Sequence, residues 1–586
     1  MDIHSHAQPT RVRVTHVSLD LDVDFAAKRL TGTAELTLDR RDATAPLVLD
    51  QQGLAIESVT GTDGSPRVFE VAPEHDHLGS AFTIQLAAQD AKVRVHYATT
   101  EHALALQWLD PEQTAGGKHP FLFTQGQAVF TRTWIPLQDT PGVRVTYDAT
   151  IRVPPALTAV MSAERVGEGQ NGVFRFRMPH AIPSYLIALA VGDIAFKPIS
   201  KRSGIWAEPS VVAVAHAELE DTEKMIQSAE KLFGPYRWGR YDLIILPPAF
   251  PFGGMENPCL TFATPTILAG DKSLVSLVAH ELAHSWSGNL VTNATWRDFW
   301  LNEGFTVYFE TRIMEAVYGK ERAVMEMQLS KADLIREMAE LAPVDQVLYV
   351  ELAGRHPDDG FSGVPYNKGA LFLMRLEEVY GRERFDGFLR SWFDAHPFQS
   401  VTTADFMAFL ERELLASDPV KARQIDLDVW LNHPGLPADC PDPRSPLLAL
   451  VDRQVALFVE TKDPARLDTR GWVTQQWLHF LEGVGGSIDA DQMARLDGTF
   501  HLTGSGNSEV LCVWLRLAVQ CSYSPADAAL ESFLMRVGRR KFLQPLYKEL
   551  AKTPAGLERA RAIYTRARPK YHAVSSGTMD EILQVR

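Results

Sequence analysis

Cysteine is scarce in this chain of 586 residues, which has only Cys259, Cys440, Cys512 and Cys521. None of the four belongs to a CxxC pair, and so few in so long a chain do not make a disulfide framework. No run of 18 or more apolar residues occurs, which argues against a transmembrane helix and a membrane partner. The first residues, MDIHSHAQPTRVRV, contain neither an apolar segment nor a small-residue cleavage site, so we expect no secretory signal. These absences favour a cytoplasmic protein.

Positive charge is also in deficit. The chain has 58 Lys and Arg residues against 73 Asp and Glu residues, and its formal net charge is -15. A nucleic-acid partner is therefore not expected, because phosphate contacts require a basic face. The proportions of hydrophobic residues (45%) and charged residues (22%) are ordinary for globular proteins. At this length we expect two to four domains, and a monomer is the simplest expectation.

The hydrophobic pattern divides the chain. Residues 1–195 alternate with a period of two, as in VSLDLDVDF (17–25) and VRVTYDATIRV (143–153), which is typical of half-buried antiparallel strands. Residues 196–432 change to a helical period, with a strand-like YDLIILPP before the glycine-rich PFGGMENP. The proline cluster in 433–446 predicts a linker, and 447–586 is helical without a short repeat motif. The sequence predicts a multidomain α+β protein.

Residues 280–289, HELAHSWSGN, place two histidines four residues apart. On a helix His280 and His284 project from one face, where neutral imidazoles suit a zinc ion. Eighteen residues separate His284 from Glu303, which begins a second apolar helix and supplies a third ligand type. The alternatives are a chance pattern on a buried helix and a carboxylate favoured by the helix dipole. With all three residues in place, we predict one Zn²⁺ per chain and an open coordination position for water.

HELAHSWSGN followed by WLNEGF resembles the M1 family of gluzincin zinc aminopeptidases. LPPAFPFGGMENPCLTF and VPYNKG resemble two further motifs of that family. TQGQAVFTRTWIPLQDTPGVRVTY and GRRKFLQPLY narrow the resemblance to its leukotriene A(4) hydrolase and aminopeptidase B-like branch. The resemblance runs from about residue 120 to residue 547. It implies an N-terminal all-β domain, a thermolysin-like α-rich catalytic domain and a C-terminal α-helical solenoid domain.

The resemblance also implies a reaction. A zinc aminopeptidase hydrolyses the N-terminal residue from short peptides by Glu-assisted attack of zinc-bound water. Glu281, which is not a ligand, is expected to act as the general base and to pass the proton to the leaving amine. Tyr366 in VPYNKG matches the tyrosine that stabilises the oxyanion. Without the resemblance, an amphipathic core tyrosine would be the better interpretation of Tyr366.

The substrate contacts follow from the same motifs. Gly253 and Gly254 permit a peptide to lie along this segment as an extended strand, and Glu256 would then bind its free N-terminal ammonium. Gln127 matches a second contact to the amine, and Gln125 is expected two residues earlier on the same strand face. Further expected contacts are the pair that binds the C-terminal carboxylate, Arg539 and Lys541, and the pocket residues Phe252 and Met255. Arg540 is expected to face away. Each of these residues also has an ordinary interpretation, as a turn, core or surface residue.

One departure from the branch bears on specificity. Asp358 in HPDDGFSGVPY falls where the branch carries an aspartate linked to epoxide hydrolysis, but Phe361 replaces a second tyrosine of vertebrate members. Asp358 could equally be a loop acid in a turn. The alternative function, an epoxide hydrolase that acts on a lipid epoxide at the same zinc, is therefore weaker than peptide hydrolysis.

Overall fold

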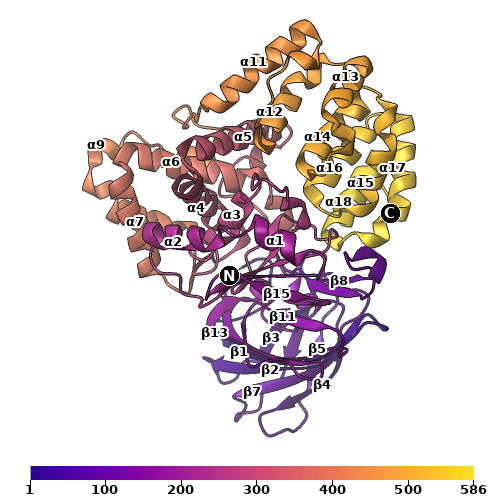
Figure 1. Cartoon of the computed structure of the whole chain (residues 1–586). Helices are drawn as coiled ribbons and strands as arrows, with labels where there is room; N and C mark the ends of the chain where they lie inside the picture. The colour runs from indigo at the N-terminus through magenta and orange to yellow at the C-terminus, as the bar shows by residue number, and fades with distance from the viewer. Residues whose placement is uncertain (1, 586) are drawn as a thin grey trace.

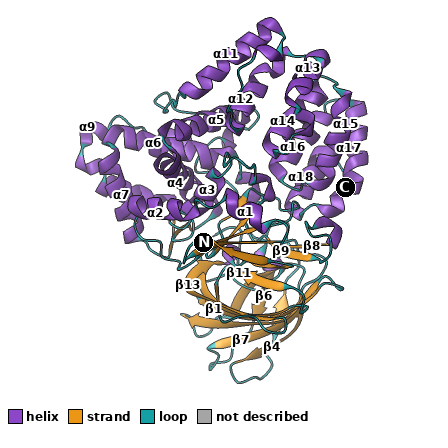
Figure 2. Ribbon diagram, in the orientation of Figure 1, coloured by secondary structure: helices purple, strands orange, loops and turns teal. Residues whose placement is uncertain are grey.

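The alternating segments near the N-terminus form strands whose apolar residues are buried. The computed structural model describes residues 2–585 and shows a strand-rich part, a helical middle part and a C-terminal helical part (Figures 1 and 2). In β1 (Val12–Asp24), Val17, Leu19, Leu21 and Val23 are buried, and the aspartates between Leu19 and Phe25 are exposed. The predicted face of this strand is confirmed.

Three sheets build the strand-rich part. The seven-stranded sheet has the order β12 (Glu164–Arg165), β13 (Val173–Pro183), β10 (Arg144–Arg152), β1, β2 (Arg29–Arg40), β7 (Lys92–Ala98) and β4 (Ala55–Gly61). Within it, β1 pairs with β10 in parallel, with Val17 opposite Tyr147. The four-stranded sheet has the order β11 (Thr158–Met161), β14 (Leu189–Gly192), β9 (Phe121–Thr124) and β8 (Leu106–Leu109). The third sheet contains β3 (Leu47–Gln51), β6 (Ser80–Ile84) and β5 (Phe69–Val71).

A five-stranded sheet begins the middle part. Its order is β15 (Ala195–Pro198), β16 (Ser203–Ala207), β17 (Tyr241–Ile245), β19 (Leu260–Ala263) and β18 (Gly254–Met255). β15 starts at the residue where we expect the first domain to end, and it pairs with β16. β18 is the edge strand of this sheet, so one side of its backbone is free to pair with another chain.

The helices of the middle part surround the helix pair that carries the zinc motif. They are α1 (Val212–Glu218), α2 (Thr222–Phe233), α3 (Ser276–Ala283), α4 (Trp300–Tyr318), α5 (Lys320–Met338), α6 (Gly369–Tyr380), α7 (Arg382–Ala395), α8 (Thr403–Glu413), α9 (Pro419–Ala422) and α10 (Leu427–Asn432). A short two-stranded sheet joins β20 (Val291–Asn293) to β21 (Gln399–Val401). α4 is the central helix, and 13 of its 19 residues are buried.

The C-terminal part is helical and has its own hydrophobic core, which runs from Val451 to Leu583. It contains α11 (Pro446–Thr461), α12 (Thr474–Val484), α13 (Ala490–Phe500), α14 (Ser508–Gln520), α15 (Asp527–Arg536), α16 (Arg540–Leu550), α17 (Pro554–Ala567) and α18 (Ala573–Leu583). Residues 433–445, in the predicted linker, contain no helix or strand. No helix within residues 2–585 combines the length and the apolar character needed to cross a bilayer. The predicted fold class, with a β part followed by two helical parts, is confirmed.

Candidate active site

His280, His284 and Glu303 converge as the spacing of their motif predicts. The Nε2 atoms of His280 and His284 lie 3.5 Å and 3.4 Å from the same atom, Glu303 Oε2. One ligand-type atom from each residue lies within 4.8 Å of the other two. Glu303 Oε2 is buried and accepts no hydrogen bond, although a buried carboxylate oxygen is costly to leave unpaired. Two imidazole nitrogens and an unsatisfied carboxylate oxygen that face one point fit a zinc ion.

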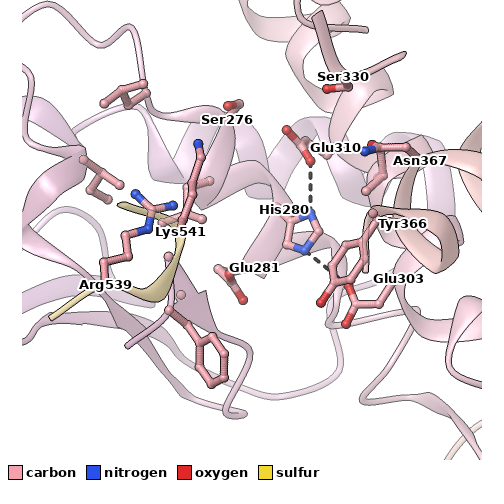
Figure 3. A pocket seen from close by; sticks show the side chains of 18 of the residues that line it. Ser276, His280, Glu281, Glu303, Glu310, Ser330, Tyr366, Asn367, Arg539 and Lys541 are labelled. Carbon is pink, nitrogen blue, oxygen red and sulfur yellow. Dashed lines mark hydrogen bonds and ion pairs between the residues drawn. The ribbon is translucent and has the colours of Figure 1, made fainter. Parts of the chain in front are cut away.

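The opposite ring nitrogens of both histidines are held by neighbouring groups. His280 Nδ1 is 3.0 Å from Oε2 of Glu310, which lies on α4 seven residues after Glu303 (Figure 3). His284 Nδ1 is 2.8 Å from the carbonyl oxygen of Ser287 and 3.1 Å from Oγ1 of Thr306. Such partners favour the tautomer with a proton on Nδ1 and leave Nε2 free to bind a metal.

Two glycines bring Tyr366 to the same point. α4 crosses α6 where Gly304 meets Gly369, and a Cβ atom on Gly304 would lie only 2.7 Å from the Cα atom of Gly369. This close contact brings the residues before α6 next to Glu303. They form a single π-helical turn, Val364–Lys368, a form that often occurs at functional sites. The Tyr366 ring stacks on the His280 ring with centroids 6.2 Å apart.

A cavity of about 620 Å³ opens around this cluster. Twelve of the expected site residues line it: Gln127, Phe252, Gly253, Gly254, Glu256, His280, Glu281, His284, Glu303, Tyr366, Arg539 and Lys541. In Figure 3, Glu281 lies between His280, Glu303 and Tyr366 on one side and Arg539 and Lys541 on the other. The cavity therefore has one end with the three candidate metal ligands and one cationic end.

The two glycines of PFGGMENP are required by close approach. A Cβ atom on Gly254 would lie 2.3 Å from Oε1 of Glu281, and one on Gly253 would lie 2.7 Å from Nη2 of Arg539. Gly254 begins the edge strand β18, so its backbone is next to both the expected base and open space for a peptide. A side chain at either glycine would displace a charged group of the site.

Glu256 follows this strand and is buried, with a carboxylate oxygen within 4.8 Å of a His284 nitrogen. Its Oε1 atom accepts no hydrogen bond, and the Nε2 atom of Gln127 is also unpaired. The Glu256 backbone is fixed, because its carbonyl accepts a hydrogen bond of 2.7 Å from Asn289 Nδ2. Arg144 of β10 in turn donates to the Asn289 carbonyl at 2.6 Å. A rigid, unpaired carboxylate of this kind suits a cationic ligand group.

Backbone pairing positions the cationic end. Gly538 N donates to Pro248 O at 2.8 Å and Arg540 N donates to Pro251 O at 2.9 Å, so the residue between them is held beside Gly253. Arg539 is 7% exposed, whereas Lys541 is exposed. The expectation for Arg540 was wrong. Its guanidinium lies 5.7 Å from the ring centroid of Phe252, and it lines the same cavity because the backbone pairing turns it inward.

Three expected substrate contacts do not line the cavity. Gln125 donates to Met255 Sδ at 3.2 Å, and both side chains are buried behind the wall. The expectation that Gln125 and Gln127 share a strand face was also wrong, because β9 ends at Thr124. Asp358 is half-buried with its Oδ1 atom unpaired, near His356, whereas Phe361 does line the cavity. Gln125, Met255 and Asp358 thus support the wall of the cavity or lie behind it.

Burial and charge set the protonation of the site. Burial raises the pKa of Glu281 to about 8, with both histidines opposing the shift and Glu256 and Glu303 adding to it. Burial also acts to raise the pKa of Glu303, but the histidines outweigh it and lower that pKa to about 2. Burial, followed by the nearby acids, raises the pKa of Tyr366 well above its ordinary value. The cluster thus combines an ionised ligand carboxylate with a phenol that stays protonated.

Two contributors were not found in the sequence. Glu310 lies seven residues after Glu303 in an apolar helix, and this helical spacing could have revealed it. Glu509 is a buried acid in the first turn of α14 that contacts Arg539 and Lys541. Nothing near Glu509 in the sequence points to a site 30 residues further along the chain.

Comparisons with known proteins agree with this geometry. Residues 217–430 match the Peptidase family M1 domain, 13–186 match the Peptidase M1 N-terminal domain, and 472–583 match Leukotriene A4 hydrolase, C-terminal. The chain is 35% identical to leukotriene A-4 hydrolase from Xenopus laevis, over 98% of each chain. It is 36% identical to aminopeptidase B from Mus musculus, over 96% of this chain and 92% of the relative.

A solved structure shows the same architecture. Yeast LTA4 hydrolase in complex with bestatin aligns with a TM-score of 0.93 and 31% identity, over 100% of this chain and 97% of that one. The predicted class of enzyme, a metallopeptidase with a zinc cofactor, is confirmed. With relatives above 30% identity over nearly its whole length, this chain belongs to peptidase family M1, in the group that includes leukotriene A4 hydrolase and aminopeptidase B.

Proposed function

We propose that this enzyme is an aminopeptidase that removes the first residue from short peptides with a free N-terminus. The observation that carries this proposal is the unpaired, buried carboxylate of Glu256 in the cavity of the metal-binding cluster. An ammonium group at Glu256 would place the first peptide bond of the substrate near His280, His284 and Glu303. An endopeptidase substrate brings no N-terminal ammonium to this position, so the buried carboxylate would stay unpaired.

His280, His284 and Glu303 would hold the zinc. When bound, zinc polarises the scissile carbonyl and lowers the pKa of water towards 7. The Glu281 carboxylate accepts a proton from the attacking water and delivers it to the nitrogen of the leaving amine. Its place beside Gly254 fits this role, because the substrate backbone would lie along the same strand edge.

Tyr366 would stabilise the oxyanion that forms as water attacks. Its hydroxyl must carry a proton to donate a hydrogen bond, and burial among acids keeps it protonated by raising its pKa well above the ordinary value. The close packing of Gly304 on Gly369 supports the role, because it fixes the π-helical turn relative to Glu303. The donor would therefore be in place before the charge develops.

Substrate length would be read at the other end of the cavity. Arg539 and Lys541 lie on the side of Glu281 away from His280, and they suit the C-terminal carboxylate of a short peptide (Figure 3). Gln127 would give a second contact to the N-terminal ammonium beside Glu256. Binding of both termini favours tripeptide-sized substrates over proteins.

The four cysteines are free, which supports the expected cytoplasmic location, and we favour a monomer.

Hydrolysis of a lipid epoxide at the same centre is the alternative, since one relative is named a leukotriene A-4 hydrolase. Two observations favour peptides. Phe361 lines the cavity without a hydroxyl group, and Asp358 is not among the residues that line it. Competition between an aminoacyl-anilide and a lipid epoxide separates the two functions.

The decisive experiment compares one tripeptide with a free N-terminus and the same peptide after N-acetylation. Acetylation removes the positive charge that Glu256 would bind, so we expect cleavage of the free peptide and a loss of at least about 100-fold in kcat/KM for the acetylated one. Liquid chromatography of the released amino acid measures both rates. Similar cleavage of the two peptides would contradict the role of Glu256, and no cleavage of either would contradict aminopeptidase activity.

A further inference from the structure

The cationic end of the cavity contains an acid of its own. Glu509 Oε1 lies 3.3 Å from Arg539 Nη1, and Lys541 Nζ lies 2.9 Å from Oε1 and 2.8 Å from Oε2 of Glu509. All three side chains line the cavity. α14 supplies the acid from its first turn, and the two cations flank the start of α16. Arg539 and Lys541, which suit a substrate carboxylate, thus already bind the carboxylate of Glu509.

Burial makes this internal partner important. Glu509 and Arg539 are each only 7% exposed, so their charges are poorly screened by water. Burial alone would raise the pKa of Glu509, but Lys541 and Arg539 outweigh it and lower the pKa below its ordinary range, so the carboxylate is ionised at neutral pH. The three groups carry two positive charges and one negative charge, which leaves a net charge of +1 for a ligand.

Arg539 also has binding capacity left over. Its Nη1 atom donates to Thr266 Oγ1 at 3.0 Å, but its Nε atom is buried without a hydrogen-bond partner. Its Nη2 atom packs against Gly253, where a side chain would not fit, and Arg539 as a whole lines the cavity. An incoming carboxylate can therefore reach Arg539, but it must share the two cations with Glu509 and approach that negative charge closely.

We propose that Glu509 is a specificity-determining residue that competes with the peptide's C-terminal carboxylate for Arg539 and Lys541 and thereby limits retention of the product. This inference rests on the proposed aminopeptidase function. Hydrolysis of a tripeptide gives an amino acid and a dipeptide, and the dipeptide keeps the C-terminal carboxylate. Without Glu509, the buried Arg539 and the exposed Lys541 would carry two uncompensated positive charges that hold substrate and product alike, whereas one net charge permits recognition and then release.

The test replaces Glu509 with Gln, which keeps the size and the hydrogen-bond acceptor but removes the charge. For the zinc-loaded full chain we expect KM for a free-acid tripeptide, divided by KM for the same tripeptide with a C-terminal amide, to fall about tenfold, equivalent to about 1.4 kcal/mol. The inhibition constant of the dipeptide product should fall by a similar factor. Glu509→Asp, which retains the charge, should stay within about twofold of the wild type.

If Glu509 only orients the two cations, the ratio of the two KM values should not fall. In that case Glu509→Gln would raise the ratio of the two KM values or leave it unchanged, and either result would overturn the proposal. Glu531→Gln is the matched control, because Glu531 is an acid of the same helical part that pairs with Arg566 and does not line the cavity. The control should leave the ratio at its wild-type value.

Two further measurements separate a failure of the Glu509 proposal from a variant that does not fold and from a failure of the aminopeptidase proposal. If Glu509→Gln fails to fold, Lys541→Gln tests the same balance from the other side, since it leaves no net positive charge and should raise the KM ratio about tenfold. An unchanged ratio in Lys541→Gln would overturn the proposal. The wild-type rate on an aminoacyl-anilide, which has no C-terminal carboxylate, tests the aminopeptidase function independently of Glu509.

Discussion

Glu281 and Glu303 are carboxylates of one buried cluster, and their surroundings separate their roles. Glu303 faces both histidines and has a pKa lowered to about 2, as suits a permanently ionised ligand. Glu281 Oε1 lies beside Gly254, and burial raises the pKa of this carboxyl to about 8. A bound divalent cation would lower the pKa of Glu281 again, towards neutral pH. Among these acids, Glu281 is therefore the one suited to exchange a proton during turnover.

Replacement of Glu281 by Gln tests this assignment. We expect kcat on an aminoacyl-anilide to fall by about 10²- to 10⁴-fold, because the amide cannot accept the proton of the attacking water. Zinc content should stay at one ion per chain, since the expected ligands are untouched. Steady-state kinetics and elemental analysis of the same sample give the two values. Substantial remaining activity would refute the assignment of Glu281 as the base.

At the scale of secondary-structure elements, the site depends on close approach between backbones. α4 and α6 touch at Gly304 and Gly369, and this contact brings the turn with Tyr366 to the expected zinc ligands. The edge strand β18 in turn passes close to a side chain of α3, since a Cβ atom on Gly254 would lie 2.3 Å from Oε1 of Glu281. The arrangement of the expected zinc ligands and of the Tyr366 hydroxyl thus depends on glycine positions where no side chain fits.

Gly304→Ala should destabilise the enzyme although alanine is the better helix former. A Cβ atom at this position meets the backbone of Gly369 at 2.7 Å and the Pro365 carbonyl oxygen at 3.1 Å, neither of which can rotate away. We expect a net loss of about 1–3 kcal/mol from overpacking, a lower melting temperature and a lower kcat as Tyr366 is displaced. Thermal unfolding and aminoacyl-anilide kinetics measure these effects.

Gly387→Ala in α7 is the control for helix propensity. A Cβ atom at Gly387 meets nothing within 4 Å. Alanine there should raise stability by about 0.5–1 kcal/mol and leave kcat unchanged. If both variants gained stability, the close helix contact at Gly304 would not constrain the fold as described.

Local patterns in the sequence predicted the parts of the site that local structure determines. The pairing of His280 and His284 on one face follows from helix geometry alone. Glu303 joins them because α4 packs against α3, which the spacing between the motif and the next helix indicated. The alternation in β1 likewise predicted its buried face. Arg540, Gln125 and Glu509 were misjudged or missed, because their positions depend on contacts between distant segments. Gly538 and Arg540, for example, are fixed by backbone pairing with Pro248 and Pro251, a contact that no periodicity encodes.

At the scale of the whole molecule, one cavity is lined by all three parts of the chain. Gln127 comes from the strand-rich part, α3, α4 and the π-helical turn from the middle part, and α14 and α16 from the C-terminal part. The C-terminal part keeps a separate core but docks on the middle part next to Gly253. A ligand in the cavity therefore contacts all three parts at once.

Removal of the metal should affect both activity and stability. A ligand that binds only the folded chain stabilises it, so chelation is expected to abolish hydrolysis and to lower the melting temperature. Glu303 Oε2 accepts no hydrogen bond from the protein, so removal of the metal would leave this buried oxygen without a partner. Addition of Zn²⁺ should restore both quantities, as measured by scanning fluorimetry and anilide kinetics. Full activity in the presence of a strong chelator would contradict a catalytic metal.

The segments that would break the peptide bond and those that would select the peptide come from separate stretches of sequence. Glu281, Glu303 and Tyr366 lie within 276–368, whereas the acid and the cations at the far end lie within 508–541. A mutant library confined to α14 and the start of α16 could therefore explore new chain lengths and C-terminal chemistries without disturbing the hydrolytic centre. Laboratory evolution of this scaffold towards longer or amidated peptides should begin there.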